Sequence, residues 1–244
     1  MPPERRFRGF RVSNNVSSFA RVPAMSFDHS RSATRAAIKS IGPVSLLTPE
    51  FFDADPRKVA RALLGKLLVR KTAKGILAGR VVETEAYLGE GDAAAHAAAG
   101  KTARNSVLFG PPGFVYVYFI YGNYFCLNVS CLPDGIPGGV LFRAMEPVAG
   151  IEAMVKSRGI VIAKESDLKR VSSGPGRMAE ALGITRERDN GKNFASAKSD
   201  LQLVDDGYRV HRVIVTPRIG ITKSVEEPLR YVIAGNRFVS GPKL

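Results

Sequence analysis

Two glutamates and a tyrosine at alternate positions, Glu83, Glu85 and Tyr87, have the types and spacing best suited to acid–base chemistry. They lie in the stretch VVETEAYLGE, which is typical of a β-strand, and alternation along a strand places all three on one face. An ordinary amphipathic strand with a solvated acidic edge would give the same pattern. The chain is basic overall, with 36 Lys and Arg against 22 Asp and Glu. An acidic strand is unusual in such a chain, and we interpret it as a sign of a chemical role. The chemistry that fits is a glutamate acting as general base toward a water molecule.

Three further polar residues are candidates for the same site. Arg143 lies within the apolar stretch VLFRAMEP, where an unpaired guanidinium would be costly, so we expect it to meet a carboxylate or a substrate. A purely structural salt bridge would explain it equally well. His96, between alanines, could cap a helix, pack in the structure without a functional role, or belong to the site. Asn128 in CLNVS either satisfies backbone groups or contacts a ligand.

The cysteines and histidines are not spaced as metal ligands. Cys126 and Cys131 lie close together without a second cysteine pair, and His29 and His211 are distant in sequence. We therefore expect neither a metal site nor a disulfide framework, and this cysteine usage suits a reducing compartment. No apolar run approaches the ~20 residues needed to span a bilayer, which predicts a soluble protein without a membrane partner.

The charge indicates a polyanionic partner. The net charge is +14, and residues 1–40 contribute eight basic and two acidic residues. The rest of the chain then holds 28 basic and 20 acidic residues, a net charge of +8. Contacts to nucleic-acid phosphates would use this charge, although a generally basic protein without such a partner has the same composition.

The stretch YVYFIYGNYFCLNVS, residues 116–130, predicts a β-hairpin with its turn at Gly122 and Asn123. Core packing would explain Tyr116 or Tyr118 better than Tyr121, which is expected at the tip. Enzymes that act on a base must first unstack it, and an aromatic ring at a hairpin tip is a suitable wedge. Tyr121 is therefore predicted to insert between stacked bases.

Two loop segments could contact phosphates. SSGPGRMAEALGI is a Gly-rich entry to a helix without the Lys-Ser/Thr of a P-loop, so helix capping is favoured over phosphate binding. Lys101 and Arg104 in GKTARNS could face phosphates or belong to a solvated loop.

The elements that must position these residues predict an α+β domain. Residues 1–44 are Arg/Ser-rich and without periodicity, and are interpreted as a disordered basic tail, an organelle transit peptide or a segment before a true start at Met25. Residues 45–244 form the globular domain. We expect a helix from Asp55 to Gly65, strands in LLVRK and AGRVVETEAYL, and a helical turn from Asp92. The hairpin, a strand in GGVLFRAMEP, helices over 148–158 and 176–183, and strands over 201–240 follow.

Six stretches in order give the chain a specific resemblance to the alkyladenine (3-methyladenine) DNA glycosylases, from about Leu47 to Ser240. They are ARALLGKLLVR, VETEAYLG, GPPG followed by YVYFIYGNYFCLNVS, VLFRAMEP, SGPGRMAEALGI and PRIGI. The resemblance implies a single mixed domain around a curved antiparallel sheet with a protruding β-hairpin.

The resemblance also implies roles for individual residues. Glu85 would activate the water, Arg143 and the backbone carbonyl of Ile219 would help to hold it, and Tyr121 would replace the extruded nucleotide. The walls around the base would be Tyr87, His96 and Tyr118, with Asn128 disfavouring the 2-amino group of guanine. Further DNA contacts would come from Asn123, Tyr124, Lys101 and Arg104. Two departures, Asn123 in place of a larger apolar residue and TARN in place of Thr-Pro-Arg-Asn, bear on lesion range and affinity.

The function that the resemblance implies is a monofunctional DNA glycosylase. It would excise alkylated or deaminated purines from double-stranded DNA by base flipping and hydrolysis, as a monomer and without cofactor or metal. Its place would be the cytoplasm, or the nucleus or an organelle if the tail is a targeting signal. The alternative is a non-catalytic nucleic-acid-binding protein that stacks bases on the hairpin tyrosines, which would leave Glu85 and Arg143 without a role.

Overall fold

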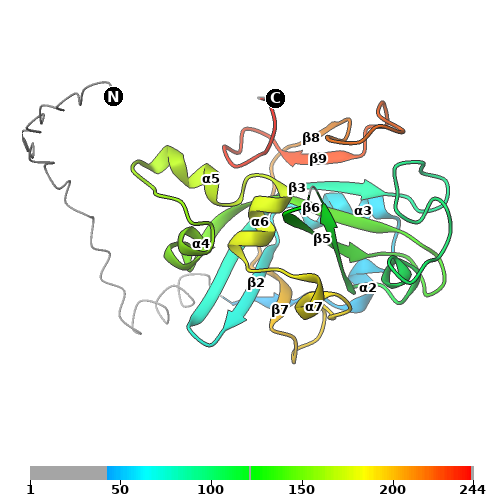
Figure 1. The fold of residues 1–244 in the computed structure, drawn as a ribbon, viewed down its shortest axis with the longest axis horizontal. Coiled ribbons are helices and arrows are strands. Elements are labelled where there is room, and N and C mark those ends of the chain that lie inside the picture. Colours follow the sequence, from blue (N-terminus) through cyan, green and yellow to red (C-terminus); the bar gives the residue numbers. More distant parts are fainter. Residues whose placement is uncertain (1–42, 121, 243–244) are drawn as a thin grey trace, which may run out of the picture.

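The computed structural model describes residues 43–120 and 122–242 (Figure 1). The expectations for residues 1–42 and for Tyr121 lie outside this range. The helices are α2 (Pro49–Phe52), α3 (Pro56–Leu63), α4 (Ile151–Ser157), α5 (Lys169–Ser172), α6 (Pro175–Ala181) and α7 (Arg186–Asp189), with short 3₁₀ turns at Ser106–Phe109 and Glu165–Leu168. The strands are β1 (Ser45–Leu46), β2 (Leu67–Thr72), β3 (Gly75–Tyr87), β4 (Val115–Ile120), β5 (Tyr124–Ser130), β6 (Gly139–Ala149), β7 (Leu201–Asp205), β8 (Val213–Thr216) and β9 (Arg230–Ile233).

One curved antiparallel sheet contains all of these strands, which confirms the α+β class. The strand order is β1-β7-β2-β3-β6-β5-β4, and β9 joins β8 to β3. Helix α6 lies next to β5 and β6 (Figure 1), and α3 packs against β3. β4 and β5 pair from Val115↔Val129 to Ile120↔Tyr124, as predicted, and protrusion of this pair from the domain stays a prediction.

Helix α3 forms where the sequence predicts it. The Asp55 side chain accepts a hydrogen bond of 2.8 Å from the Arg57 backbone N–H, and Pro56 occupies the first helical position. The helix ends at Leu63, and Gly65 takes a φ of +85° that a residue with a side chain would rarely adopt. The predicted turn at Asp92 is a succession of single turns in which the Ala95 N–H bonds to the Asp92 carbonyl.

Strand β3 changes its neighbour halfway along, and this bends the sheet. Its first half pairs with β2 and its second half with β9 at Glu83–Glu85, while β6 follows its other edge. The register between β3 and β6 shifts on both sides of Glu83. Because an irregularity of this kind bends a strand and increases its twist, the two glutamates lie where the sheet curves.

The two faces of β3 have the contents that alternation predicts. Val82 and Ala86 belong to the main hydrophobic core, and Thr84 Oγ1 donates a 2.9 Å hydrogen bond to the Ala60 carbonyl in α3. Glu83 and Glu85 lie on the opposite face, but each has an exposed fraction of 0%. The alternative of a solvated acidic edge is therefore wrong.

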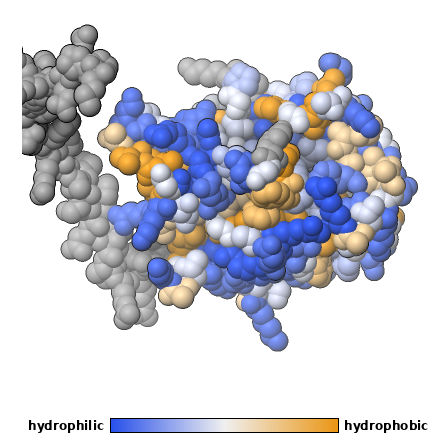
Figure 2. Space-filling model, in the orientation of Figure 1, coloured by the Kyte–Doolittle hydropathy of each residue, from blue (hydrophilic) through white to orange (hydrophobic). Residues whose placement is uncertain are grey.

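The surface drawn in Figure 2 mixes hydrophilic and hydrophobic residues, and the hydrophobic ones form separate small patches. Large hydrophobic side chains that are exposed include Val161 and Phe119. None of the helices in the described part of the chain has the length and apolar character that crossing a bilayer requires. Cys126 and Cys131 are buried free thiols.

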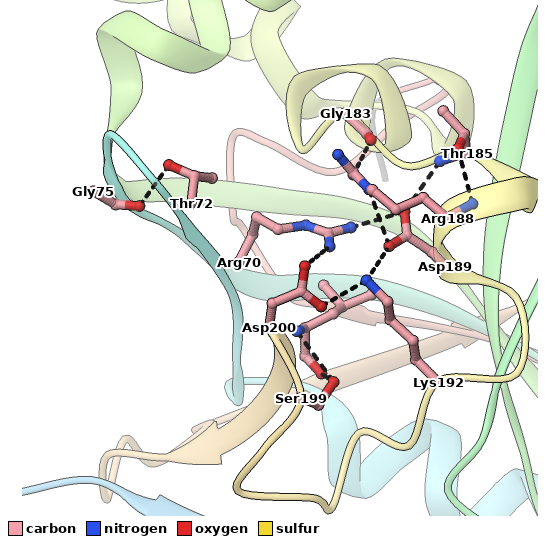
Figure 3. Close-up of polar contacts among 11 residues, drawn as sticks. Arg70, Thr72, Gly75, Gly183, Thr185, Arg188, Asp189, Lys192, Ser199 and Asp200 are labelled. Carbon is pink, nitrogen blue, oxygen red and sulfur yellow. Dashed lines mark hydrogen bonds and ion pairs between the residues drawn. The ribbon is translucent and has the colours of Figure 1, made fainter.

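A partly buried ion-pair network holds the outer strand β4 in place. Arg70 lies between Asp189 and Asp200, at 2.8 and 2.9 Å, and Lys192 contacts the same two carboxylates at 2.9 and 2.6 Å (Figure 3). The segment after Asp189 then follows β4, because Asn190 Oδ1 accepts from the Val117 N–H at 2.9 Å. Burial alone would raise the pKa of Asp189, but its contacts with Arg188, Lys192 and Arg70 outweigh burial and lower that pKa.

We expect Asp189→Ala to lower the free energy of unfolding by about 3–5 kcal/mol, because it leaves the buried Arg70 guanidinium with only the partly exposed Asp200 as a counter-ion. Urea denaturation at neutral pH measures this difference. The matched control is Glu165→Ala, which removes an exposed ion pair with Arg237 and should leave the midpoint unchanged. Equal midpoints for both variants and the unsubstituted protein would show that the network adds nothing to stability.

Candidate active site

A cavity of about 590 Å³ lies over the β3–β6–β5 part of the sheet. Its rim is formed by the loop after β3, by β4 and β5, by the segment 173–177 that enters α6, and by the loop 219–221. The cavity brings together seven residues that the sequence analysis singled out, namely Tyr87, His96, Tyr118, Tyr124, Asn128, Arg143 and Ile219.

Glu85 lies directly behind the wall of this cavity. Its Oε1 accepts a 2.8 Å hydrogen bond from the Ile219 N–H and lies 3.2 Å from Arg143 Nη1. Its Oε2 accepts a 3.0 Å hydrogen bond from the Tyr87 hydroxyl. All three donors line the cavity, whereas Glu85 itself is fully buried and does not. The carboxylate is thus one side chain away from whatever occupies the cavity.

The environment of Glu85 favours proton uptake. Burial raises the pKa of its carboxyl, and the Arg143 guanidinium, the Ile219 N–H and the Tyr87 hydroxyl offset only part of that increase. Burial and the neighbouring Glu85 also raise the pKa of Tyr87, so its hydroxyl stays protonated and donates to the carboxylate. A carboxylate with a raised pKa inside a cavity wall has the properties of a general base.

Arg143 joins the two glutamates, so the expectation that it meets a carboxylate is confirmed. Its Nε donates to Glu83 Oε1 at 3.0 Å, and its Nη1 donates to the Ile219 carbonyl at 3.2 Å. Glu83 in turn accepts from Arg230 Nε at 2.7 Å and from the Ser240 N–H and hydroxyl at 2.6 and 2.9 Å. Because Glu83 is occupied by four donors and does not line the cavity, its role is structural and differs from that of Glu85.

Aromatic rings also line the cavity. The His96 and Tyr118 rings lie 4.3 Å apart at an angle of 69°, and His96 Nδ1 lies 2.9 Å from the Tyr116 hydroxyl. Burial and the nearby Arg104 lower the pKa of His96, which leaves the ring neutral at neutral pH. Tyr116 was not assigned to the site from sequence, although its position two residues before Tyr118 on the same strand face could have indicated it.

Asn128 satisfies backbone groups, and its contact with a ligand stays a prediction. Its side chain is buried and lines the cavity, and its Nδ2 donates to the Tyr116 carbonyl at 3.2 Å and to the Cys126 carbonyl at 3.5 Å. Since carbonyl oxygens occupy the nitrogen, Oδ1 is the atom of this amide that can meet a ligand.

The remaining predicted residues lie outside the cavity lining. Lys101, Arg104 and Asn123 are exposed. The Gly-rich segment at the start of α6 contributes more than a helix cap, because Gly174, Pro175 and Gly176 all line the cavity. A side chain at Gly176 would come within 2.8 Å of the Tyr124 ring, so this glycine lets β5 approach α6.

A buried pair that was not predicted from the sequence, Asp92 and Arg218, lies behind Tyr87. Nothing in the local pattern of either residue indicates the other, since they are separated by 126 positions. Among residues 43–120 and 122–242, no group of three or more His, Cys, Asp or Glu side chains could hold a metal ion.

Comparison with known proteins places this geometry in a family. Residues 50–237 match the family described as methylpurine-DNA glycosylase. A protein from Koribacter versatilis named "Putative 3-methyladenine DNA glycosylase" is 62% identical over 204 residues, which cover 84% of this chain and 97% of that protein. Proteins with the same name from Methanocella arvoryzae and Burkholderia lata are 45% and 43% identical, covering 76% and 82% of this chain and 89% and 93% of their own lengths.

A match of this length and identity decides between the two functional classes that the sequence left open. The alternative of a non-catalytic nucleic-acid-binding protein is set aside, because the family and these relatives carry the names of enzymes that act on DNA. The chain belongs to the methylpurine-DNA glycosylase family and is a DNA glycosylase.

Proposed function

We propose that this glycosylase hydrolyses the N-glycosidic bond of alkylated or deaminated purines that have been flipped out of duplex DNA, with Glu85 as the general base. The observation that carries the proposal is the contact of the Glu85 carboxylate with Tyr87, Arg143 and Ile219, three residues of one cavity wall. The names of the relatives support an alkylated adenine as one substrate.

The cavity suits a planar base. The rings of Tyr87, His96 and Tyr118 in the cavity lining provide flat apolar surfaces, on which any purine can stack. Asn128 Oδ1 stands at the wall where the edge of a base can be probed. Ile120 and Tyr124, the paired residues on either side of the β4–β5 connection, both line the cavity, which supports Tyr121 as the wedge.

Substrate binding has to uncover Glu85 before water can react. In the structure Glu85 Oε2 accepts a hydrogen bond from the Tyr87 hydroxyl at 3.0 Å, and Glu85 Oε1 contacts the Ile219 N–H and Arg143. We propose that a base entering the cavity shifts the Tyr87 hydroxyl away from the carboxylate, and that a water molecule takes its place. Arg143 Nη1 and the Ile219 carbonyl stand at the same wall and orient that water.

The reaction then needs only protein groups and water. As the bond from C1′ to the purine nitrogen breaks, the developing positive charge on the sugar is stabilised by the Glu85 carboxylate. Water attacks C1′ and gives its proton to Glu85, and the purine leaves with the bonding electron pair. A positively charged alkylated purine leaves neutral, whereas a deaminated purine leaves as an anion that takes a proton from solvent. Alkylation or deamination makes that purine a better leaving group. The products are the free base and an abasic site in an uncut strand.

The direct test is incubation with duplexes that contain hypoxanthine, 3-methyladenine, 7-methylguanine or ethenoadenine, followed by heating in alkali. We expect strand breaks at one or more of the lesions after alkali, none before alkali, and none in an undamaged duplex. Absence of alkali-labile sites for all four lesions would refute the proposed substrate class.

We further expect the excision rate to fall with acidification at a higher pH than an ordinary glutamate would give. Glu85 must be ionised to act as the general base, and burial raises its pKa above the ordinary value of 4.5. The rate should therefore rise with pH through this raised pKa and then level off. Single-turnover excision of a neutral lesion such as hypoxanthine between pH 4.5 and pH 8 measures it, and a flat profile over that range would contradict a titrating Glu85.

A further inference from the structure

A buried ion pair behind the cavity, Asp92 with Arg218, has no role in the chemistry described above. Arg218 Nη2 donates to Asp92 Oδ1 at 2.8 Å, Nη1 bonds to Asp92 Oδ2, and the exposed fractions of the two side chains are 0% and 2%. Neither residue lines the cavity. Two charges removed so completely from water constrain the segments that carry them, whereas their net contribution to stability is small.

The pair ties together three segments that each carry a residue of the site. Arg218 also donates to the Ala86 carbonyl at the end of β3, at 3.1 Å. Asp92 accepts from the N–H groups of Leu88 and Ala94, at 3.2 and 3.0 Å, in the loop that leads to His96. The third segment is the loop of Arg218 itself.

Two contacts connect Arg218 to the catalytic wall. Its neighbour Ile219 donates through its backbone N–H to Glu85 and accepts from Arg143 through its carbonyl. The Arg218 guanidinium carbon lies 4.7 Å from the centre of the Tyr87 ring, and since Arg218 does not line the cavity, it supports the ring from behind.

We propose that Asp92 and Arg218 are positioning residues, which hold the Ile219 N–H on Glu85 and the Tyr87 ring against the substrate. This inference rests on the proposed function of Glu85. Its consequence is specific: without the pair, the loop loosens and Glu85 loses one of its hydrogen-bond donors. Groups that face Glu85 and set its charge are Arg143 from β6, Glu83 and Tyr87 from β3, Tyr118 from β4, Cys126 from β5 and Arg218.

The loss of a donor to the carboxylate raises the pKa of Glu85 further, so the acidic limb of the excision profile should move to higher pH. The plateau rate should fall by roughly tenfold to a hundredfold, since small displacements of reacting groups cost that much. Binding to lesion DNA should stay within about threefold, because neither side chain reaches the cavity.

The experiment compares Asp92→Asn, Arg218→Met and Arg218→Lys with a matched control, Asp206→Asn. Asp206 forms a bidentate pair with Arg80 as well, at 3.0 and 2.8 Å, in the part of β3 that pairs with β2. Single-turnover excision is measured against pH, and hydrogen exchange is measured for the segment around Ile219. Arg218→Lys keeps the charge and should recover part of the rate.

We expect faster exchange of the Ile219 amide and a shifted acidic limb in Asp92→Asn and Arg218→Met, and neither change in Asp206→Asn. Unchanged exchange and an unchanged profile in the folded Asp92→Asn protein would overturn the positioning role. If the unsubstituted protein excises none of the lesions, the proposed function fails, and the exchange of the Ile219 amide still decides whether the pair holds that loop.

Discussion

Replacing Glu85 with Gln should lower the single-turnover rate of base excision by roughly 10²–10⁴-fold and leave the affinity for lesion-containing duplex DNA within a few fold. The amide has the shape of the carboxylate and can still accept from the Ile219 N–H, but it cannot take a proton from water. It also lacks the negative charge that stabilises the developing charge on the sugar. Excision assays with excess enzyme, together with binding to the same duplex, separate the two effects.

Glu83→Gln provides the matched control, because it makes the same change two positions earlier on the same face of β3. Glu83 accepts from four donors on β6, β9 and the C-terminal segment, and an amide cannot accept from all of them. We therefore expect Glu83→Gln to lower the free energy of unfolding by about 3 kcal/mol, and Glu85→Gln to leave it unchanged or higher. A folded Glu85→Gln protein that excises at the original rate would remove Glu85 from the mechanism.

The contrast between these two glutamates shows what sequence could and could not predict. Alternation along the strand places both on one face, and their company with Arg143 was predictable from the cost of an unpaired buried guanidinium. Their different roles were not predictable, because the hydrogen-bond partners of Glu83 include Arg230 and Ser240, which are 147 and 157 positions away in the sequence. Only the resemblance to a family pointed to Glu85 alone.

Elements with local signals were predicted well. Asp55, Pro56 and Gly65 delimit α3 through short-range capping and turn chemistry, and the β4–β5 pairing follows from two apolar runs around a Gly-Asn turn. The bend of β3 around Glu83 could not be predicted from the local sequence, since it arises where β9 replaces β2 as the neighbouring strand. The Asp92–Arg218 pair was missed for the same reason.

The cavity itself depends on long-range packing. Tyr87, Tyr118 and Asn128 could be named from strand periodicity and family likeness, but the cavity lining also includes the segment 173–177. That segment was interpreted as a helix cap. Its second role requires Gly176 to contact the Tyr124 ring, and no local pattern records such a contact.

Arg143→Met should lower excision at pH 7 by roughly 10²-fold or more. Methionine fills similar space with an unbranched apolar chain, so the loss is mainly that of the charge and its hydrogen bonds. Glu83 keeps Arg230 and Ser240, whereas Glu85 loses the cation that lies 3.2 Å from its Oε1. The water also loses a donor at the wall. Without Arg143, less opposes the effect of burial, so the pKa of Glu85 rises further. A smaller fraction of Glu85 is then ionised at neutral pH.

The pH profile distinguishes this explanation from a simple structural defect. Raising the pH should restore part of the rate in Arg143→Met, since Glu85 ionises later, but should restore nothing in Glu85→Gln. Arg237→Met is the matched control, because it removes one exposed positive charge and should change neither the rate nor the profile when DNA is saturating. If the rate of Arg143→Met fell on acidification at the same pH as that of the unsubstituted protein, Arg143 would not set the ionisation of Glu85. In that case Arg143 would act on the water or the fold alone, and the coupling between these two buried charges would have no part in catalysis.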